Sequence, residues 1–205
     1  MILPKIYGII NYNDENSHLL LKQFIDSGIK LIQIRSKNIS EEKIEKLCKK
    51  ALEIRDATNK DVKIIINDYV SICKKLNADG VHLGQGDGDI TAAREQLGPK
   101  AIIGLSNHTL EQLNKAKEIS KALSYLALGP IFQSETKQGH AELVGTKNLK
   151  EATKLHSLPI VAIGGINKEN IDSVFSAGAS SVALISELKK AAQSGSLDDF
   201  VSSFK

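Results

Sequence analysis

Short apolar runs alternate with longer amphipathic segments along the whole chain. Several runs are almost continuously apolar, which is typical of parallel strands buried on both faces. Eight such runs predict strands: Ile6–Ile10, Leu31–Ile34, Val62–Ile66, Gly80–Leu83, Ala101–Leu105, Tyr125–Leu128, Ile160–Ile163 and Ser181–Ile185.

Helical patterns fill the segments between these runs. Ser40 is a plausible N-cap for a helix over 41–58, and Thr109 has Gln112 at the spacing of a capping box. Further helices are expected within 142–156, from Asn167 to near Gly178, and from Ser186 or Glu187 onward.

Eight strand–helix units predict an α/β protein, a single closed (β/α)₈ TIM barrel with one domain over 1–205. About 200 residues is the lower limit for this fold, so the loops must be short. The alternative is an open doubly wound sheet. That fold usually carries a glycine-rich fingerprint after its first strand, and none follows Ile10.

Charge and composition exclude several classes of partner. The net charge is +3, spread along the chain, and aromatic residues make up 4% with no Trp. This argues against nucleic acid, which favours a basic patch or stacking aromatics. There is no apolar run of about 18 residues and no signal-peptide pattern, so we expect a cytoplasmic protein with no membrane contact. We expect Cys48 and Cys73 to be small buried hydrophobic residues.

Polar residues gather where the apolar runs end, and these ends form the active-site face of such a barrel. Taken singly, each group has a structural explanation: Asn67 with Asp68 could cap a helix, and Gly164 with Gly165 could form a turn. Gln33 and Arg35 could be structural polar residues at the barrel mouth. Taken together they favour phosphate chemistry.

Asp68 and Asp87 are the acidic residues directly after the third and fourth runs, so neighbouring strands should bring them together. Two carboxylates with water and ligand oxygens suit Mg²⁺, which neutralises a pyrophosphate. Arg35, Lys37 and Lys137 would add positive charge.

Gly164, Gly165 and Ser186 follow the last two runs, where barrels often bind a phosphate through backbone N–H groups. The sequence therefore predicts a diphosphate site and a separate monophosphate site. His82 and His108 have no evident carboxylate partner, so we do not expect either to be a general acid or base.

The motifs QIRSK (33–37), INDY (66–69), ADGVHLGQGD (78–87), IGLSNH (103–108), LGPIFQSETK (128–137), VAIGGI (161–166) and AGA…VALIS (177–186) together resemble the thiamine phosphate synthase family. The resemblance implies a (β/α)₈ barrel. It also implies an enzyme that joins an aminopyrimidine carrying a hydroxymethyl diphosphate to a thiazole phosphate, with release of pyrophosphate.

The resemblance also implies residue roles. Residues expected to hold the pyrimidine diphosphate are Gln33, Arg35, Lys37, Asn67, Ser106 and Lys137, with Mg²⁺ on Asp68 and Asp87. Residues expected near the thiazole phosphate are Ser134, Thr136, Gly165, Ile185 and Ser186. The implied mechanism is dissociative, in which Arg35, Lys37 and Lys137 help to draw off pyrophosphate.

The chain departs from the family pattern at three places. Ser36 stands where Glu is common, Gln133–Ser134 replaces Pro–Thr, and 138–145 is short and atypical. None of these changes removes a charged residue that the chemistry needs.

Two alternatives share the barrel. A thiazole tautomerase-type relative would tend to lack Asn67–Asp68, the Gln85–Gly86–Asp87 element and Thr136–Lys137, all of which are present. A non-catalytic regulatory protein that binds thiamine phosphates would not need the acidic pair. A homo-oligomer is compatible with the sequence, which does not reveal oligomeric state, pathway regulation or the form of the thiazole substrate.

Overall fold

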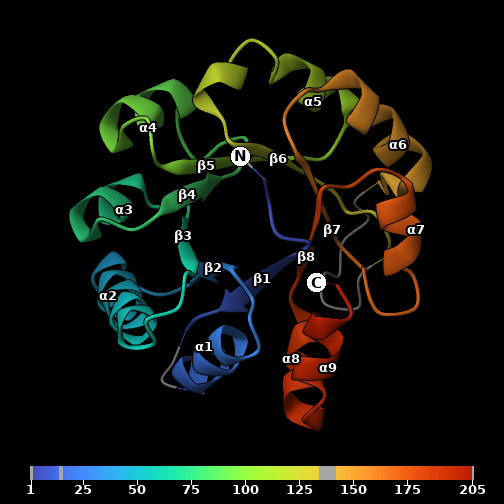
Figure 1. Ribbon diagram of the computed structural model, residues 1–205. Coiled ribbons are helices and arrows are strands. Elements are labelled where there is room, and N and C mark those ends of the chain that lie inside the picture. The colour runs from blue at the N-terminus through green and yellow to red at the C-terminus, as the bar shows by residue number, and fades with distance from the viewer. Residues whose placement is uncertain (1, 14–15, 134–141, 205) are drawn as a thin grey trace.

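The computed structural model describes residues 2–13, 16–133 and 142–204. Eight parallel strands close into a barrel in sequence order, with β8 hydrogen-bonded to β1 (Figure 1). The strands are β1 (Ile6–Asn11), β2 (Leu31–Arg35), β3 (Lys63–Asn67), β4 (Gly80–Leu83), β5 (Ile102–Asn107), β6 (Tyr125–Leu128), β7 (Ile160–Ile163) and β8 (Ser181–Leu184). The predicted barrel is confirmed, and the open doubly wound sheet is excluded.

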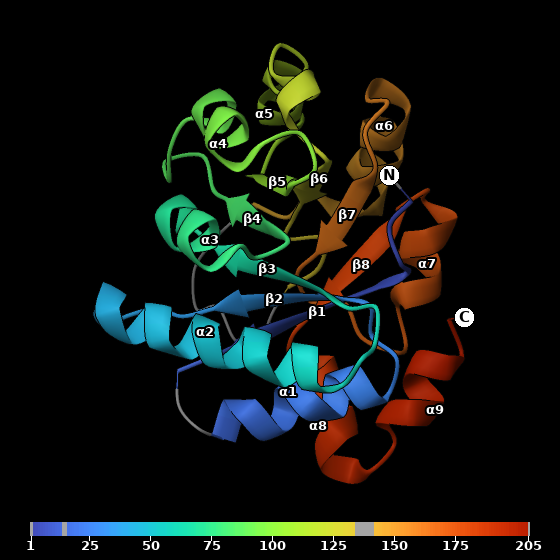
Figure 2. The same cartoon turned by 60° about the vertical axis from the view of Figure 1, so that its left-hand side comes forward.

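Helices surround the strands on the outside of the barrel (Figures 1 and 2). They are α1 (Asn16–Asp26), α2 (Glu41–Ala57), α3 (Val70–Leu76), α4 (Ile90–Leu97), α5 (Leu110–Lys115), α6 (Gly145–Leu155), α7 (Ile171–Ser176), α8 (Ser186–Ser194) and α9 (Leu197–Ser202), with a 3₁₀ turn at Ser120–Ala122. None of the helices in the described ranges has the length and apolar composition needed to cross a bilayer.

Two predicted N-caps are confirmed. The Ser40 hydroxyl accepts from the N–H of Lys43, and the Thr109 hydroxyl accepts from the N–H of Gln112. The helix expected from Asn167 starts later, at Ile171, because the Asn167 side-chain oxygen accepts from the N–H groups of Glu169 and Asn170 and forms a turn. A side chain that bonds the following backbone in this way competes with helix formation.

The C-terminal segment forms two helices where the sequence predicted one. Gly195 has a φ of 74° at the end of α8, and its N–H bonds back to the carbonyls of Ala191 and Ala192. A left-handed residue in this position ends a helix. The chain then turns into α9, which packs beside α8 (Figure 1).

Alternate strand residues face the barrel lumen, and the others face the helices. The lumen contains its own cluster of buried side chains, which includes Tyr7, Ile9, Ile65 and Tyr125. Gly104 makes room for one of them, because a Cβ at this position would lie 2.1 Å from Cζ of Tyr125. The lumen is therefore filled by side chains, and a ligand site is expected above it, at the carboxyl ends of the strands.

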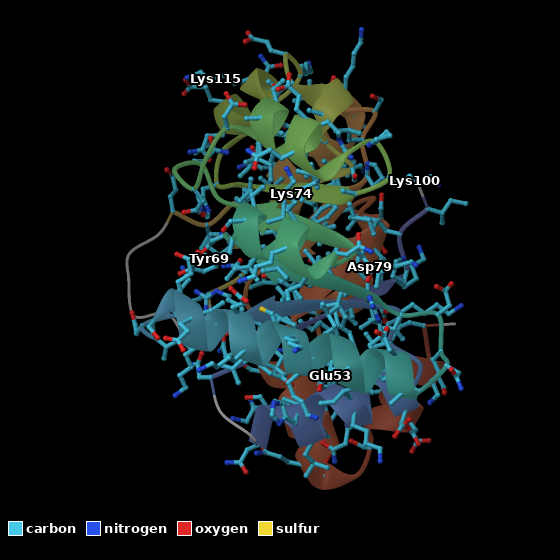
Figure 3. All side chains as sticks on the ribbon, turned by 90° about the vertical axis from the view of Figure 1, so that its left-hand side faces the viewer. Glu53, Tyr69, Lys74, Asp79, Lys100 and Lys115 are labelled. Atoms are coloured by element: carbon cyan, nitrogen blue, oxygen red, sulfur yellow. The ribbon has the colours of Figure 1, made fainter. Side chains whose placement is uncertain are left out.

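The two ends of the barrel carry different residues. Tyr69 follows the carboxyl end of β3, whereas Asp79 precedes the amino end of β4, and the two lie toward opposite ends of the molecule in Figure 3. Asp79 is an ion-pair centre for Arg55 and Lys63, and it also accepts from the N–H of Ile64. The amino end is therefore held by structural ion pairs, and the candidate site lies at the opposite end.

Candidate active site

Arg35 is the last residue of β2 and is held in place by the neighbouring strand. Its Nη1 donates to Oδ1 of Asn11 at 3.0 Å, and Asn11 is the last residue of β1. Gln33 lies two residues earlier on the same face, with only 2% of its surface exposed. Lys37 follows in the exposed loop. The end of β2 thus offers one amide in the lumen and two cations above it.

Asp68 and Asp87 come together across the ends of β3 and β4, as the sequence predicted. Burial, a hydrogen bond with Asp87 and the charge of Asp87 raise the pKa of Asp68 to about 6, while Lys37 and Arg35 act in the opposite direction. Two carboxyls in contact repel each other when both are ionised. A proton or a cation between them removes this repulsion.

The backbone fixes both carboxyls. Asp68 has a φ of 67°, and its N–H donates to the carbonyl of His82 at 2.9 Å, which ties the exit of β3 to β4. Asp87 closes a turn in which its Oδ2 accepts from the N–H of Gly84 at 2.8 Å. A left-handed residue costs free energy unless it is Gly, Asn or Asp, so this position restricts the residue type.

Ser106 is half-buried at the end of β5. Its hydroxyl lies 2.8 Å from Nε2 of His82, and its carbonyl accepts from Nε2 of Gln85 at 2.6 Å. Asn67, at the end of β3, is 7% exposed. These polar groups lie between the charged residues and the lumen, where a flat ring could be held.

Both histidines are hydrogen-bonded to other groups of the barrel. His82 is buried between Tyr125 and Ser106, and burial lowers its pKa to about 4. Nδ1 of His108 lies 2.7 Å from the carbonyl of Gly129. Neither ring nitrogen pair contacts a carboxylate among the described residues, so neither histidine has the partner that a general base usually needs.

A cavity of about 190 Å³ lies at the ends of β7 and β8. This exceeds the share of liquid volume of one water, about 30 Å³, so a small anion fits. The lining residues are Gln133, Ile163, Gly164, Gly165, Ile166, Asn167, Ala183, Leu184, Ile185, Ser186, Glu187 and Lys190. Ser186 is the first residue of α8, whose N-terminal N–H groups favour a bound anion.

Gly165 shapes one wall of this cavity. It has a φ of 63°, and a Cβ here would lie 2.4 Å from the carbonyl oxygen of Gln133 and 2.6 Å from that of Phe132. Real Cβ contacts are not this short, so a larger residue would displace the loop that follows β6. The predicted residues Gly165, Ile185 and Ser186 thus lie together.

Three predicted residues, Ser134, Thr136 and Lys137, lie outside the described residues. The structure therefore brings together Gln33, Arg35, Lys37, Asn67, Asp68, Asp87 and Ser106 on one side of the barrel mouth. Gly165, Ile185 and Ser186 line the cavity across the mouth. The two predicted phosphate sites would therefore lie on different sides of the mouth.

Sequence reasoning missed several residues of the site. Asn11 follows an apolar run in the same way as Arg35, so its position at a strand end was a usable signal. Lys190 lies one helical turn after Ser186, on the same face of α8. Tyr7 and Tyr125 belong to apolar runs of different strands, and nothing in the sequence indicates that their hydroxyls meet.

The sequence profile of the family described as "Thiamine monophosphate synthase" (TMP-TENI) matches residues 6–188. A thiamine-phosphate synthase of Caldicellulosiruptor saccharolyticus is 39% identical over 188 residues, covering 89% of this chain and 82% of that protein. One from Psychrobacter sp. is 41% identical over 165 residues, covering 80% and 76%.

A solved structure with the same fold is the thiamine phosphate pyrophosphorylase of Pyrococcus furiosus. It superposes with a TM-score of 0.79 at 28% identity, and the match covers 98% of this chain and 96% of that one. The family match spans the whole barrel, including both sides of the mouth. The chain therefore belongs to the thiamine monophosphate synthase family and is a transferase of thiamine biosynthesis.

Proposed function

We propose that the chain joins an aminopyrimidine carrying a hydroxymethyl diphosphate to a thiazole phosphate, forming thiamine phosphate and releasing pyrophosphate with the help of Mg²⁺. The observation that carries the proposal is the Asp68–Asp87 pair beside Arg35 and Lys37. It faces the β7–β8 cavity across the barrel mouth. A two-substrate reaction with a diphosphate and a monophosphate needs two such sites.

The acidic pair fits a magnesium ion. Both side chains offer hard oxygen ligands, and burial together with the neighbouring Asp87 raises the pKa of Asp68, which supports a cation at this position. No group of three or more His, Cys, Asp or Glu side chains that could hold a metal occurs in the described ranges. We therefore assign the ion two protein carboxylates, with water and diphosphate oxygens as its other ligands. When bound, the ion would neutralise charge on the departing pyrophosphate.

The first chemical step breaks the bond between the pyrimidine methylene carbon and the ester oxygen that joins it to the diphosphate. The electron pair leaves with the diphosphate, where Arg35 and Lys37 stabilise the added charge. In the second step the lone pair of the thiazole nitrogen forms the new C–N bond. No proton is transferred, which agrees with the absence of a histidine–carboxylate pair among the described residues. Positioning and electrostatics supply the rate enhancement.

On the other side of the mouth, Gly165, Ile185 and Ser186 would hold the thiazole phosphate. The backbone N–H groups at the start of α8 favour an anion, and Ser186 adds a hydroxyl. Glu187 also lines the cavity, but its Oε1 accepts from the N–H of Lys168 at 3.2 Å. Ser134, Thr136 and Lys137 complete the predicted set from outside the described residues.

Pyrophosphate release tests this function. Purified protein with both substrates and Mg²⁺ should release pyrophosphate and form thiamine phosphate in equal amounts, and a chelator should stop both. A chain that binds both ligands without release would be the regulatory alternative. Turnover of a thiazole phosphate alone would support the tautomerase alternative. The cytoplasmic location, the single-domain organisation and the homo-oligomer stay predictions.

A further inference from the structure

A continuous chain of hydrogen bonds crosses the barrel lumen from Gln33 to Ser106. Nε2 of Gln33 donates to the Tyr7 hydroxyl at 3.0 Å, and the hydroxyls of Tyr7 and Tyr125 lie 2.9 Å apart. Nδ1 of His82 lies 2.8 Å from the Tyr125 hydroxyl, and its Nε2 lies 2.8 Å from Oγ of Ser106. We call Tyr7, Tyr125 and His82 the lumen relay.

The three side chains of the lumen relay are buried and held in place by packing. Tyr7 and Tyr125 are 1% and 0% exposed, and their rings meet edge to face with centroids 5.8 Å apart. The His82 ring stacks on Tyr125 at 5.6 Å with an interplanar angle of 15°. Gly104 leaves the space that Tyr125 occupies. Buried hydroxyls must find their partners within the protein, so each proton of the relay has a defined place.

With Nε2 of Gln33 as the donor to Tyr7, counting donors gives the direction of the other protons. Gln33 already donates to the oxygen of Tyr7, so the Tyr7 proton points to Tyr125. The Tyr125 proton then goes to Nδ1 of His82, which accepts. A neutral imidazole with Nδ1 as acceptor carries its proton on Nε2, and this proton points to Ser106. All four hydrogen bonds therefore run in one direction.

The two ends of this series of hydrogen bonds then have opposite roles toward a ligand. Oε1 of Gln33 accepts no hydrogen bond from any described residue, so it is an acceptor for a ligand. The Ser106 hydroxyl oxygen accepts from His82, which leaves its own proton free to donate to a ligand. An aminopyrimidine carries an N–H donor and a ring-nitrogen acceptor side by side. The corresponding oxopyrimidine carries a carbonyl acceptor and a ring N–H donor, which is the reverse.

We propose that the lumen relay fixes Gln33 as an acceptor and Ser106 as a donor, and that it thereby selects an aminopyrimidine diphosphate over its oxo analogue. The inference rests on the proposed function and on the expectation, implied by the family resemblance, that Gln33 and Ser106 hold the pyrimidine diphosphate. The three relay members are positioning residues, because they act through Gln33 and Ser106. Turning the Gln33 amide by 180° would reverse the donor and the acceptor in each of the four hydrogen bonds. The preference for the amino compound therefore depends on all four bonds together.

The main experiment removes one relay hydroxyl. Tyr125→Phe keeps the ring over Gly104 but cuts the chain in the middle, so Gln33 and Ser106 can each turn independently. Dissociation constants of the amino and the oxo pyrimidine diphosphates, measured by calorimetry with Mg²⁺ and no thiazole phosphate, give a selectivity ratio. We expect this ratio to fall about tenfold, the effect of one well-placed hydrogen bond. The affinity for thiazole phosphate should not change.

Tyr12→Phe is the matched control. Tyr12 is 0% exposed, and its hydroxyl has no hydrogen-bond partner within the part of the chain that the structure describes. The control should keep the wild-type selectivity ratio. If Tyr125→Phe folds and its ratio equals that of Tyr12→Phe, the proposal is overturned. If the wild-type protein binds neither pyrimidine diphosphate, the proposed function fails instead.

A second measurement needs no turnover, and it reads the wild-type protein directly. The nitrogen chemical shifts of ¹⁵N-labelled histidine in the wild-type protein at neutral pH report which nitrogen of His82 carries the proton. The chain has five histidines, so a His82→Gln spectrum identifies the signal. The proposal requires the Nε2–H form. The Nδ1–H form would mean that the chain of bonds runs the other way, and it would overturn the predicted preference for the amino compound.

Discussion

The two sides of the barrel mouth offer different kinds of contact to a phosphate. The charged side, defined by Arg35, Lys37, Asp68 and Asp87, offers cationic and acidic side chains. The glycine side, defined by Gly164, Gly165, Ile185 and Ser186, uses backbone and the start of a helix. Binding on the charged side should depend on which charged side chains are present. Binding on the glycine side should depend on the space that its small residues leave.

This difference has a chemical reason. A diphosphate that departs gains negative charge, so its site must supply mobile or metal-borne positive charge when the bond breaks. A monophosphate that stays attached keeps its charge, and fixed dipoles suffice to bind it. Substitutions on the charged side should therefore affect turnover, and substitutions on the glycine side should affect the affinity for one substrate.

The largest effect is expected from Asp68→Asn. Asn tolerates the left-handed φ of 67° at this position, so the change removes charge with little backbone strain. Turnover should fall by about 10³-fold, in the range of losing one preorganised electrostatic group. Steady-state rates of pyrophosphate release at saturating Mg²⁺ measure this effect.

The control for that variant is Asp89→Asn. Asp89 caps α4 by accepting from the N–H of Ala92, and Asn is an equally good cap. Its rate should match that of the wild type. If Asp68→Asn keeps full activity with a normal melting temperature, Asp68 is not a metal ligand.

Gly165→Ala should weaken binding on the glycine side more than on the charged side. The added Cβ collides with the carbonyl oxygen of Gln133, and the positive φ adds strain, for a total of about 2 kcal/mol. We expect the KM for thiazole phosphate to rise about 30-fold, the factor that corresponds to this free energy. The KM for the pyrimidine diphosphate should rise less, because the displaced segment leads to Lys137.

Gly195→Ala is the control that introduces backbone strain without a steric collision. Gly195 also has a positive φ, 74°, but no atom lies within 4 Å of a Cβ built there. This variant should lose about 1 kcal/mol of stability and keep both KM values. Equal increases of both KM values in Gly165→Ala would show that the two sides are not independent.

The pH dependence of magnesium binding sharpens the comparison. The pKa of Asp68 is raised to about 6 in the metal-free protein, so Asp68 must release a proton to bind Mg²⁺ below that pH. Affinity should fall about tenfold between pH 7 and pH 5, as expected for one proton with this pKa. Calorimetric titrations in buffers of different ionisation enthalpy measure both the affinity and the proton released. Thiazole phosphate affinity serves as the internal reference.

The same pKa has a consequence for stability. A carboxyl whose pKa is raised by folding destabilises the metal-free protein when it is ionised; this loss shrinks as the pH falls below about 6 and is gone only below its ordinary pKa of 3.8. The free energy of unfolding of the wild type relative to Asp68→Asn should therefore increase from pH 7 to pH 5. A constant difference across this range would contradict the coupling of Asp68 with Asp87.

Ser186→Ala should have the smallest effect. The variant loses one hydroxyl but keeps the N–H groups of the first turn of α8, so the KM for thiazole phosphate should rise about threefold. Ser194→Ala, at the other end of the same helix, is the matched control and should leave this KM unchanged. A loss as large as that of Gly165→Ala would mean that the side chain, and not the backbone, dominates this site.

The barrel was predictable because parallel strands buried on both faces leave continuous apolar runs in the sequence. The structure places β2 at Leu31–Arg35 and β4 at Gly80–Leu83, within one residue of the expected ranges. Helix ends were less predictable. Asn167 resembles a helix cap, yet its side chain forms a turn before α7, and only the local backbone decides between these outcomes.

The charged side was predictable for the same reason as the barrel. Neighbouring strands in sequence are neighbours in space, so residues after β3 and β4 had to lie close together. The lumen relay was not predictable, because Tyr7 and Tyr125 belong to strands that are not adjacent in the closed barrel. Their hydroxyls meet across the lumen, at a distance that depends on the tilt and closure of all eight strands.

Gly104 and Tyr125 should behave as one unit under mutation. An alanine at 104 would occupy the position of the Tyr125 ring, so it is tolerated only where residue 125 is smaller. Single-site libraries at either position should return mostly inactive variants, whereas a library that varies both should recover smaller pairs. Among functional relatives, the two positions are therefore expected to change together and seldom alone.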